Sequence, residues 1–427
     1  MSVSRTFVII LLGLAASVAS GQYLEATIPV GDSPAEVLWA DAVNKVYVAN
    51  SQDASVTVID GATNAVLTTI PVGDYPDFLC WNRRENKVYC TRGETEDRLV
   101  VIDAIGDTVL REVPISHCPG HMALSETQNK LYISCNDDPV YRITVLDCGP
   151  DTVLRNIPAQ GVGALLWSPA TNRVFSCGAD TIRVIDCESD EVVVRMQGGG
   201  DVWCYNPVNE LIYLAARHSI YALSPGGDSI VAEVPGWAYA LAAVPFTNKV
   251  YASGSASGIQ VIDAANNIVA DTIPVVTGDM VCDLAKGRVY GANFNTHEIC
   301  VVGAWADSLI KTIPLGRYPE FLCWNSVDSR VYVNDFMDNV VYVIRDTSTG
   351  ISETERGLSA HRSRPATVWS TGALWHAGCS PADLVDACGR RVCSLRPGHN
   401  DIRALAPGVY FVRQGDDGRA CKVVTSR

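Results

Sequence analysis

The stretch Asn44-Lys45-Val46-Tyr47 decides the fold, because similar tetrads return along most of the chain. Four further copies keep its order of Asn, basic, aliphatic and aromatic residues: Asn86–Tyr89, Asn129–Tyr132, Asn172–Phe175 and Asn248–Tyr251. Weaker copies end at Tyr213, Tyr290 and Tyr332, so the aromatic residue returns about every 40 residues. A fixed period of this length indicates a repeat architecture.

Two further patterns divide each repeat. A Val-Ile-Asp type triplet ends at Asp60, Asp103, Asp147, Asp186 and Asp263, and an Ile-Pro or Val-Pro pair ends at Pro71, Pro114, Pro158, Pro235, Pro274 and Pro314. Clusters of Gly, Asn, Asp and Pro between them are typical of turns. The second repeat therefore predicts four strands, Asp77–Trp81, Lys87–Thr91, Arg98–Asp103 and Val109–Val113. Four-stranded antiparallel sheets repeated around an axis make an all-β propeller.

The number of blades follows from the first strands, which are expected near Val37, Phe78, Met122, Ala164, Val202, Leu241, Val281 and Phe321. The last repeat lacks a fourth strand, whereas Tyr23–Val30 is an unpaired strand of the fourth type. Docking this strand on the last blade would hide an open sheet edge. We expect eight blades with a one-plus-three closing blade. Seven is the alternative, if the divergent fifth unit, Asp201–Pro235, is misread.

The repeats resemble the YVTN family of β-propellers, a bacterial and archaeal group of secreted or surface proteins. The string NKVYVANSQDASVTVIDGATNAVLTTIPVGDYP, Asn44–Pro76, carries the resemblance, which extends over about Tyr23–Ile344. The resemblance implies a propeller in a surface setting. It implies no reaction, because one fold hosts many functions.

Residues 1–21 have the order of a secretory signal peptide. Arg5 precedes an apolar core, Phe7–Ala16, and small residues follow it. Cleavage is expected near Gly21 or Gln22, which would leave no integral membrane span. An uncleaved anchor is the alternative. We therefore expect the protein to be exported and to lie outside the cell or at the cell surface. The periplasm is another possible compartment.

The repeats end near residue 345, and the composition of the chain changes after them. After the propeller at 22–345, residues 346–365 are polar and indicate a linker, and residues 366–427 indicate a small β-sandwich-like domain. The segment CGRRVCSLRPGHNDIRALAPGVYFVR, Cys388–Arg413, resembles C-terminal sorting domains of proteins secreted by the type IX system. The resemblance implies contact with that secretion machinery. The usual Asn-Pro start of these domains is absent, and an ordinary small β-domain is the alternative.

The composition of the chain restricts the classes of ligand and metal that it is expected to bind. A formal net charge of −14 argues against nucleic acid, because phosphate binding needs clustered Lys and Arg. The 15 cysteines are mostly expected as buried thiols, although Cys80 with Cys90 and Cys388 with Cys393 flank turns and are candidate pairs. No CxxC spacing occurs, so no structural metal is expected.

Candidate ligand-binding residues lie on the loops that enter the innermost strands, at the expected channel mouth. The His117-Cys118-Pro119-Gly120-His121 cluster aligns with the loop that carries Asp74, and equivalent loops carry Asp32 and Arg317. A metal site would need further ligands, so we predict neither metal nor cofactor. The candidates are Asp32, Asp74, His117, His121 and Arg317.

The repeated residues favour structural roles. The Asp that ends each triplet is expected to accept hydrogen bonds from the next turn, and Trp39, Trp81 and Trp324 are expected to pack between blades. No nucleophile elbow, phosphate loop or dinucleotide motif occurs. We therefore expect an exported, non-catalytic propeller that binds a protein or a glycan. The alternatives are an enzyme or quinone-cofactor protein with a site at the channel mouth, and a structural envelope component.

Overall fold

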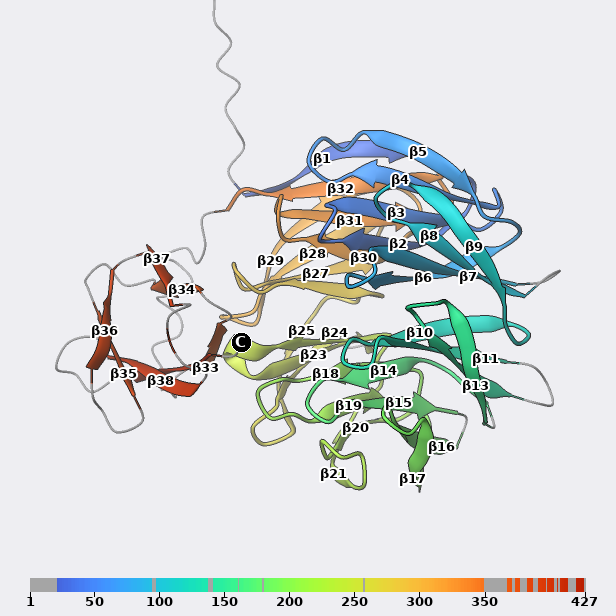
Figure 1. Ribbon diagram of the computed structural model, residues 1–427. Coiled ribbons are helices and arrows are strands. Elements are labelled where there is room, and N and C mark those ends of the chain that lie inside the picture. Colours follow the sequence, from blue (N-terminus) through green and yellow to red (C-terminus); the bar gives the residue numbers. More distant parts are fainter. Residues whose placement is uncertain are drawn as a thin grey trace, which may run out of the picture.

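The computed structural model describes residues 21–348, apart from 94–96, 137–140, 160, 179 and 256–257, and short segments between 367 and 425. Residues 1–20, most of the predicted signal peptide, and 349–366, most of the predicted linker, lie outside the described residues. The strands between Gln22 and Asp346 form eight separate four-stranded antiparallel sheets set around a ring (Figure 1). The predicted eight-bladed propeller is confirmed.

Each of the first seven blades is a meander whose strands follow one another from the innermost to the outermost. Blades 1 to 4 are β2 (Pro34–Ala40), β3 (Lys45–Asn50), β4 (Ser55–Asp60), β5 (Val66–Pro71); β6 (Pro76–Asn82), β7 (Lys87–Arg92), β8 (Arg98–Asp103), β9 (Thr108–Pro114); β10 (Pro119–Ser125), β11 (Lys130–Cys135), β12 (Arg142–Asp147), β13 (Thr152–Pro158); β14 (Leu165–Ser168), β15 (Arg173–Cys177), β16 (Thr181–Asp186), β17 (Glu191–Gln197).

Blades 5 to 7 are β18 (Val202–Tyr205), β19 (Ile212–Ala215), β20 (Ser219–Leu223), β21 (Ile230–Pro235); β22 (Ala240–Val244), β23 (Lys249–Ser255), β24 (Gly258–Asp263), β25 (Ile268–Ile273); β26 (Met280–Asp283), β27 (Arg288–Asn293), β28 (Glu298–Gly303), β29 (Ser308–Pro314). A single 3-10 turn, η1 (Pro245–Thr247), follows β22. The divergent fifth unit is therefore a complete blade, and the seven-bladed alternative is wrong.

The eighth blade closes the ring as predicted. Its strands β30 (Pro319–Asn325), β31 (Arg330–Asp335) and β32 (Val340–Asp346) are joined by the N-terminal strand β1 (Gln22–Pro29). In Figure 1 the blue β1 lies beside the orange β32, and Gln22 pairs with Asp346 while Pro29 pairs with Val340. The innermost strands of all eight blades contact their neighbours in a closed circle, from β2 round to β30 and back.

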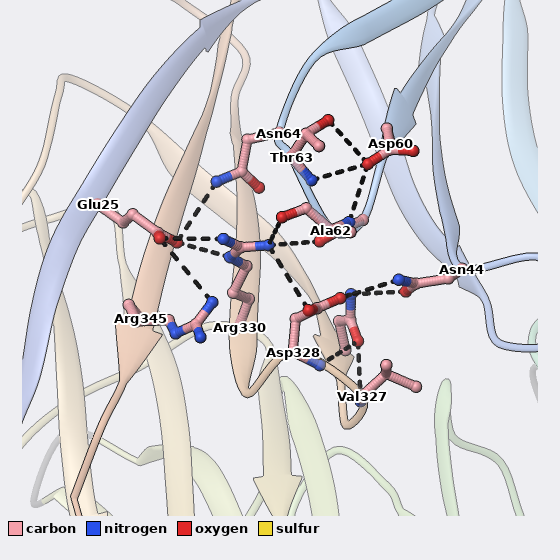
Figure 2. Close-up of polar contacts among 12 residues, drawn as sticks. Glu25, Asn44, Asp60, Ala62, Thr63, Asn64, Val327, Asp328, Arg330 and Arg345 are labelled. Atoms are coloured by element: carbon pink, nitrogen blue, oxygen red, sulfur yellow. Dashed lines mark hydrogen bonds and ion pairs between the residues drawn. The ribbon is translucent and has the colours of Figure 1, made fainter.

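Side chains reinforce the closure. Figure 2 shows the guanidinium of Arg330 on β31 between the carboxylate of Glu25 on β1 and the turn of blade 1. Arg330 donates to both carboxylate oxygens of Glu25, at 2.6 and 3.0 Å, and to the carbonyl of Ala62 at 2.8 Å. The hydrogen bond from Arg330 lowers the pKa of Glu25 below its ordinary value. One buried cation thus joins both ends of the ring to the first blade.

The two rims of the ring carry different loops. Because neighbouring strands are antiparallel, every innermost strand begins at one rim and ends at the other. We call the first the entry rim; it carries the loops between blades and the turns between second and third strands. The opposite rim, the latch rim, carries the two other turns of each blade, including the repeated tetrads.

The tetrad connects each blade to the next at the latch rim. Asn86 turns the chain from β6 into β7 with a left-handed φ of 53°. Lys87 donates to both carboxylate oxygens of Asp151 in the next blade at 2.9 Å, and the Tyr89 hydroxyl donates to the same carboxylate at 2.9 Å. All three side chains are buried. Removing one member of such a buried pair costs about 3–5 kcal/mol, so the tetrad is a structural contact.

The same contact recurs around the ring. The hydroxyl of the tetrad tyrosine, or of its weaker copy, meets an Asp or Asn of the next blade in six further pairs: Tyr47–Asp107, Tyr132–Asp190, Tyr213–Asn267, Tyr251–Asp307, Tyr290–Asp346 and Tyr332–Asn64. Blade 4 departs from it, because Phe175 has no hydroxyl. There Gly227 comes so close to the Phe175 ring that a Cβ would lie 2.5 Å from it, and Arg173 donates to the Gly226 carbonyl at 2.6 Å.

The outermost strands carry two features that prevent pairing of their open edges. Each has a β-bulge opposite the third strand, and in six blades the extra residue is an exposed aliphatic side chain: Leu67, Leu110, Leu154, Val193, Val231 and Ile310. In the closing strand the bulge residue is Glu25, which holds Arg330. Six of these strands also end in a proline, which has no N–H to donate. Bulges and prolines both discourage edge-to-edge aggregation.

The expected roles of the repeated Asp and Trp residues agree with the structure. The carboxylate of Asp60 accepts from the backbone N–H groups of Ala62 and Thr63, at 3.1 and 2.7 Å. Trp81 packs in the core shared by blades 1 and 2 and donates to Asp41 of the preceding blade at 2.9 Å. Trp324 stacks on Tyr290 with ring centroids 5.9 Å apart.

Cys80 and Cys90, named above as a candidate pair, do not face each other. Cys90 pairs across the sheet with Leu79, so the side chains of Cys80 and Cys90 point to opposite faces, and both are free thiols. Buried thiols prevail among the described cysteines, and burial raises the pKa of Cys204 to about 12. Cys388 lies outside the described residues, so its proposed pairing with Cys393 stays a prediction.

The C-terminal region contains strands, as the sequence predicts. They are β33 (Thr367–Ser370), β34 (Ala373–His376), β35 (Ala382–Asp386), β36 (Arg391–Leu395), β37 (Gly398–Asp401), β38 (Gly408–Arg413) and β39 (Ala420–Thr425). Five form a sheet in the order β33-β39-β38-β35-β36, and β34 pairs with β37. Within the described residues, no helix has the length and apolar character needed to cross a bilayer.

Candidate functional site

The predicted site residues lie at the entry rim, held by different neighbours. Asp32, Asp74, His117 and Arg317 are on loops that join one blade to the next, and His121 is on the innermost strand β10. Asp32 accepts from the side-chain amide of Asn339 at 2.9 Å. The candidates thus share a rim and are distributed over several blades around it.

Two of these residues, Arg317 and His117, already contact carboxylates of neighbouring loops. The Arg317 guanidinium donates to Asp338 at 2.8 Å and to the carbonyl of Met337 at 3.2 Å. His117 Nδ1 lies 2.9 Å from the carboxylate of Asp97. These pairs organise the rim loops.

His121 is the one predicted residue that reaches the inner ring of strands. Its ring packs on that of Phe78, with centroids 4.3 Å apart. Burial lowers the pKa of His121, and the charge of Asp201 opposes the effect. The His121 side chain thus contacts an aromatic ring and remains exposed at the entry rim. Among the residues that the structure describes, no group of three or more His, Cys, Asp and Glu side chains is arranged to hold a metal ion.

Four carboxylates on the inner strands form a different cluster, which we call the acidic quartet: Glu36, Asp77, Asp279 and Glu320. They come from four successive blades, because the ring closure brings blades 7 and 8 beside blades 1 and 2. Each lies at the start of its innermost strand or directly before it, close to the entry rim. The quartet therefore surrounds the ring axis on one side.

Two members of the quartet also connect neighbouring blades. A carboxylate oxygen of Glu36 accepts the backbone N–H of Leu79 in blade 2. Asp279 accepts the N–H of Leu322 in blade 8 at 3.0 Å and that of Met280 at 2.8 Å. These bonds fix the two carboxylates at the inner ring.

The quartet is electrostatically unfavourable when fully ionised. Burial raises the pKa of Glu36 to about 8, and the charges of Asp77 and Asp279 add to the shift. Burial raises the pKa of Asp279 to about 6. Neighbouring atoms also raise the pKa of Asp77 by partial burial, but its side chain is exposed, so solvent screens this shift. Burial and the charges of Asp279 and Asp77 raise the pKa of Glu320. Carboxylates from different blades therefore act on one another.

Among the described residues, no ion pair of a Lys or Arg reaches the quartet. The ion pairs of these basic side chains go to other carboxylates. No basic group lowers the pKa of any of the four members. Glu36, whose pKa is raised to about 8, therefore keeps its proton at neutral pH unless a cation from outside the chain stabilises its charge.

The sequence contained a signal for the quartet that the loop alignment missed. Pro34, Pro76 and Pro319 begin equivalent innermost strands. A carboxylate follows each of them within two residues: Glu36, Asp77 and Glu320.

Comparisons with known proteins support the fold. No protein-family model matches the chain, and no curated protein sequence matches it significantly. Among solved structures, hydrazine synthase from Kuenenia stuttgartiensis is 17% identical with a TM-score of 0.53, over 75% of this chain and 97% of that chain. The computationally designed Ika8 protein is 16% identical with a TM-score of 0.61, over 76% of this chain and 99% of that chain. At such identities the likeness concerns the fold alone.

Proposed function

We propose that this chain is an exported, non-catalytic β-propeller that binds a protein or glycan ligand at its entry rim, outside the cell or at its surface. The acidic quartet is the single observation that carries the proposal. Four carboxylates with raised pKa values and no basic partner among the described residues are costly to the free protein, and a ligand that supplies donors or positive charge would relieve that cost.

The repeated residues support this choice of face. The tetrads are used for contacts between blades at the latch rim, so they are not available to a ligand. The entry rim carries the loops that differ most from blade to blade, and binding residues are commonly found on variable loops of a rigid scaffold. The signal-like N-terminus motivates the proposal of export, and the C-terminal region is proposed to engage secretion machinery.

Affinity capture tests the proposal. The protein without residues 1–21 is immobilised and exposed to extracellular and envelope fractions and to a glycan array, and a captured ligand is expected to bind more weakly to Asp77→Asn/Glu320→Gln. A ligand whose binding changes only with latch-rim substitutions such as Arg84→Ala would contradict the choice of face. Removal of residues 366–427 tests the export role, because the protein is then expected to remain inside the cell.

An enzyme is the second candidate function. Carboxyls whose environments move their pKa values apart are typical of general acid–base sites, and Glu36 at about 8 and Asp279 at about 6 differ in this way. One similar structure bears the name of an enzyme, hydrazine synthase, but a shared fold carries no reaction with it. Turnover of any substrate in a hydrolase and redox screen that is lost in Glu36→Gln would favour this candidate over the binding protein.

A structural envelope component is disfavoured by the outermost strands. Their bulges and terminal prolines block the sheet edges through which propellers would associate. Sedimentation of the purified protein as large assemblies would reverse this conclusion.

A further inference from the structure

We infer that the entry rim of blades 7 and 8 is a docking surface for a basic segment of a protein partner, in which a Lys or Arg side chain reaches the acidic quartet across an aromatic patch. The inference rests on the proposed binding function and identifies the chemistry of the ligand. The aromatic patch consists of four aromatic residues, Phe294, Tyr318, Phe321 and Phe336, and the apolar Met337 that follows Phe336 in the chain.

The patch spans blades 7 and 8. Phe294, between β27 and β28, stacks on Tyr318 with ring centroids 5.3 Å apart. The backbone N–H of Phe336, between β31 and β32, donates to the carbonyl of Tyr318 at 3.3 Å. Phe321 lies on β30, with its N–H donated to Asn334 on β31 at 2.7 Å. These bonds hold the segments that carry Phe321 and Phe336 beside Tyr318, and the Phe294–Tyr318 stack joins blade 7 to the loop that enters blade 8.

Three of its five members are exposed, and Phe294 and Tyr318 are half-buried. Phe321 is 38% exposed, Phe336 is 36% exposed and Met337 is 52% exposed. Large apolar side chains on a rim that the fold does not need to cover indicate an interaction surface. The exposed aliphatic residues of the outermost strands differ, because they lie at the outer edge of each blade and away from the quartet.

The patch adjoins the acidic quartet directly. Phe321 follows Glu320 in the chain and has the position on its innermost strand that Glu36 has in the next blade. The Phe294 ring lies against Gly278, where a Cβ would be 3.6 Å from it, and Gly278 precedes Asp279. One ligand group can therefore contact an aromatic ring and a carboxylate of the quartet together.

The negative charge of the quartet favours a ligand that carries a cationic group. Aromatic faces beside carboxylates suit an ammonium or guanidinium group, which gains both a cation–π contact and an ion pair. The basic group nearest in the chain, Arg317, is already paired with Asp338 and the Met337 carbonyl, so it leaves the quartet unneutralised. A neutral glycan could stack on the rings but would leave the carboxylates without a cation, and anionic nucleic acid would be repelled. A basic protein segment satisfies both features.

Matched peptides test the inference with the full mature protein, without residues 1–21. Fluorescein-labelled peptides of one flexible sequence carry Arg, Lys, Gln or Glu at two central positions, and anisotropy gives the dissociation constants at pH 8 in low salt. The Arg and Lys peptides are expected to bind at least tenfold more tightly than the Gln peptide, with the difference reduced at pH 5. Equal affinity for the Arg and Gln peptides would overturn the inference.

Variants separate the patch from general electrostatics. Asp77→Asn/Glu320→Gln is expected to lose at least tenfold in affinity for the Arg peptide, and Phe321→Ala/Phe336→Ala at least fivefold. The control Glu188→Gln/Glu233→Gln removes the same charge from exposed positions outside the entry rim of blades 7 and 8 and is expected to change affinity less than twofold. An equal loss in this control would show a non-specific effect of net charge and would overturn the inference.

Two outcomes distinguish this inference from the proposed function. Binding of neutral oligosaccharides that is lost in Phe321→Ala, without binding of the Arg peptide, would make the rim a glycan site, overturning the inference while retaining the proposed function. Failure of the mature protein to bind any protein, peptide or glycan would overturn both.

Discussion

Replacement of Glu36 by Gln is expected to stabilise the ring at neutral pH. Gln keeps a side-chain oxygen that can accept the N–H of Leu79, but it removes the charge that burial and the neighbouring carboxylates disfavour. Raising the pKa from 4.5 to about 8 means that folding binds a proton. Below pH 4.5 the raised pKa therefore costs the native protein no stability. As the pH rises from 4.5 to 8, the free energy of unfolding of the wild-type protein falls relative to that of the variant.

The size of the Glu36 pKa shift sets an upper limit on the stabilisation expected from Glu36→Gln. At about 1.4 kcal/mol per pKa unit, the change from 4.5 to about 8 gives a ceiling of about 3 kcal/mol at pH 7. Glu36 retains some contact with solvent, which screens its charge, so we expect a gain of about 1–2 kcal/mol.

Urea denaturation of both proteins at intervals from pH 4 to pH 9 measures the effect. The stability difference should be close to zero at pH 4, grow through pH 5–8 and then level off. The exposed Glu188→Gln serves as the control and should show no such dependence. A difference that does not change with pH, or a Glu36→Gln protein less stable than wild type at pH 8, would refute the electrostatic account of the quartet.

Further predictions concern the blade contacts, the closure and the thiols. Asp151→Ala removes the counter-ion of the buried Lys87 ammonium, which keeps only the carbonyls of Cys148 and Gly149, and should destabilise the protein by about 3–5 kcal/mol in urea denaturation, against about 1 kcal/mol for Tyr89→Phe. Equal costs would contradict the charge-based contact. Arg330→Ala should accelerate amide hydrogen exchange in β1 and leave blades 3–6 unchanged, and uniform acceleration would argue against a local closure. Native alkylation followed by peptide mass analysis should modify exposed Cys118 well before buried Cys90, and early modification of Cys90 would show that its blade opens.

The repeats made the fold predictable to the level of single strands. The four strands predicted for the second repeat have ends within one residue of β6 to β9. The closing strand, predicted as Tyr23–Val30, is Gln22–Pro29. Such accuracy is physical in origin, because each tetrad both turns the chain and contacts the next blade, so its period is the period of the structure.

The candidate site was harder to predict because it depends on ring closure. Asp77 and Asp279 are 202 residues apart (279 − 77), and only the docking of β1 on β32 brings blades 1 and 2 beside blades 7 and 8. The alignment of rim loops selected Asp32 and Arg317, whereas the quartet lies three or four residues farther along, at Glu36 and Glu320. The Cys80–Cys90 error had a similar origin, because symmetric distance from a turn does not decide which face of a strand a side chain occupies.

The pKa of Glu36, followed by carboxyl ¹³C NMR in protein labelled at glutamate and assigned with Glu36→Gln, tests the central claim most directly. The account predicts a value near 8 in the free protein, because burial and the neighbouring carboxylates disfavour its charge without a basic partner to offset them. It also predicts a clear fall when the Arg peptide saturates the entry rim, because a cation stabilises the ionised form. Titration near the ordinary value of 4.5 in the free protein, or a raised pKa that the bound peptide leaves unchanged, would contradict it.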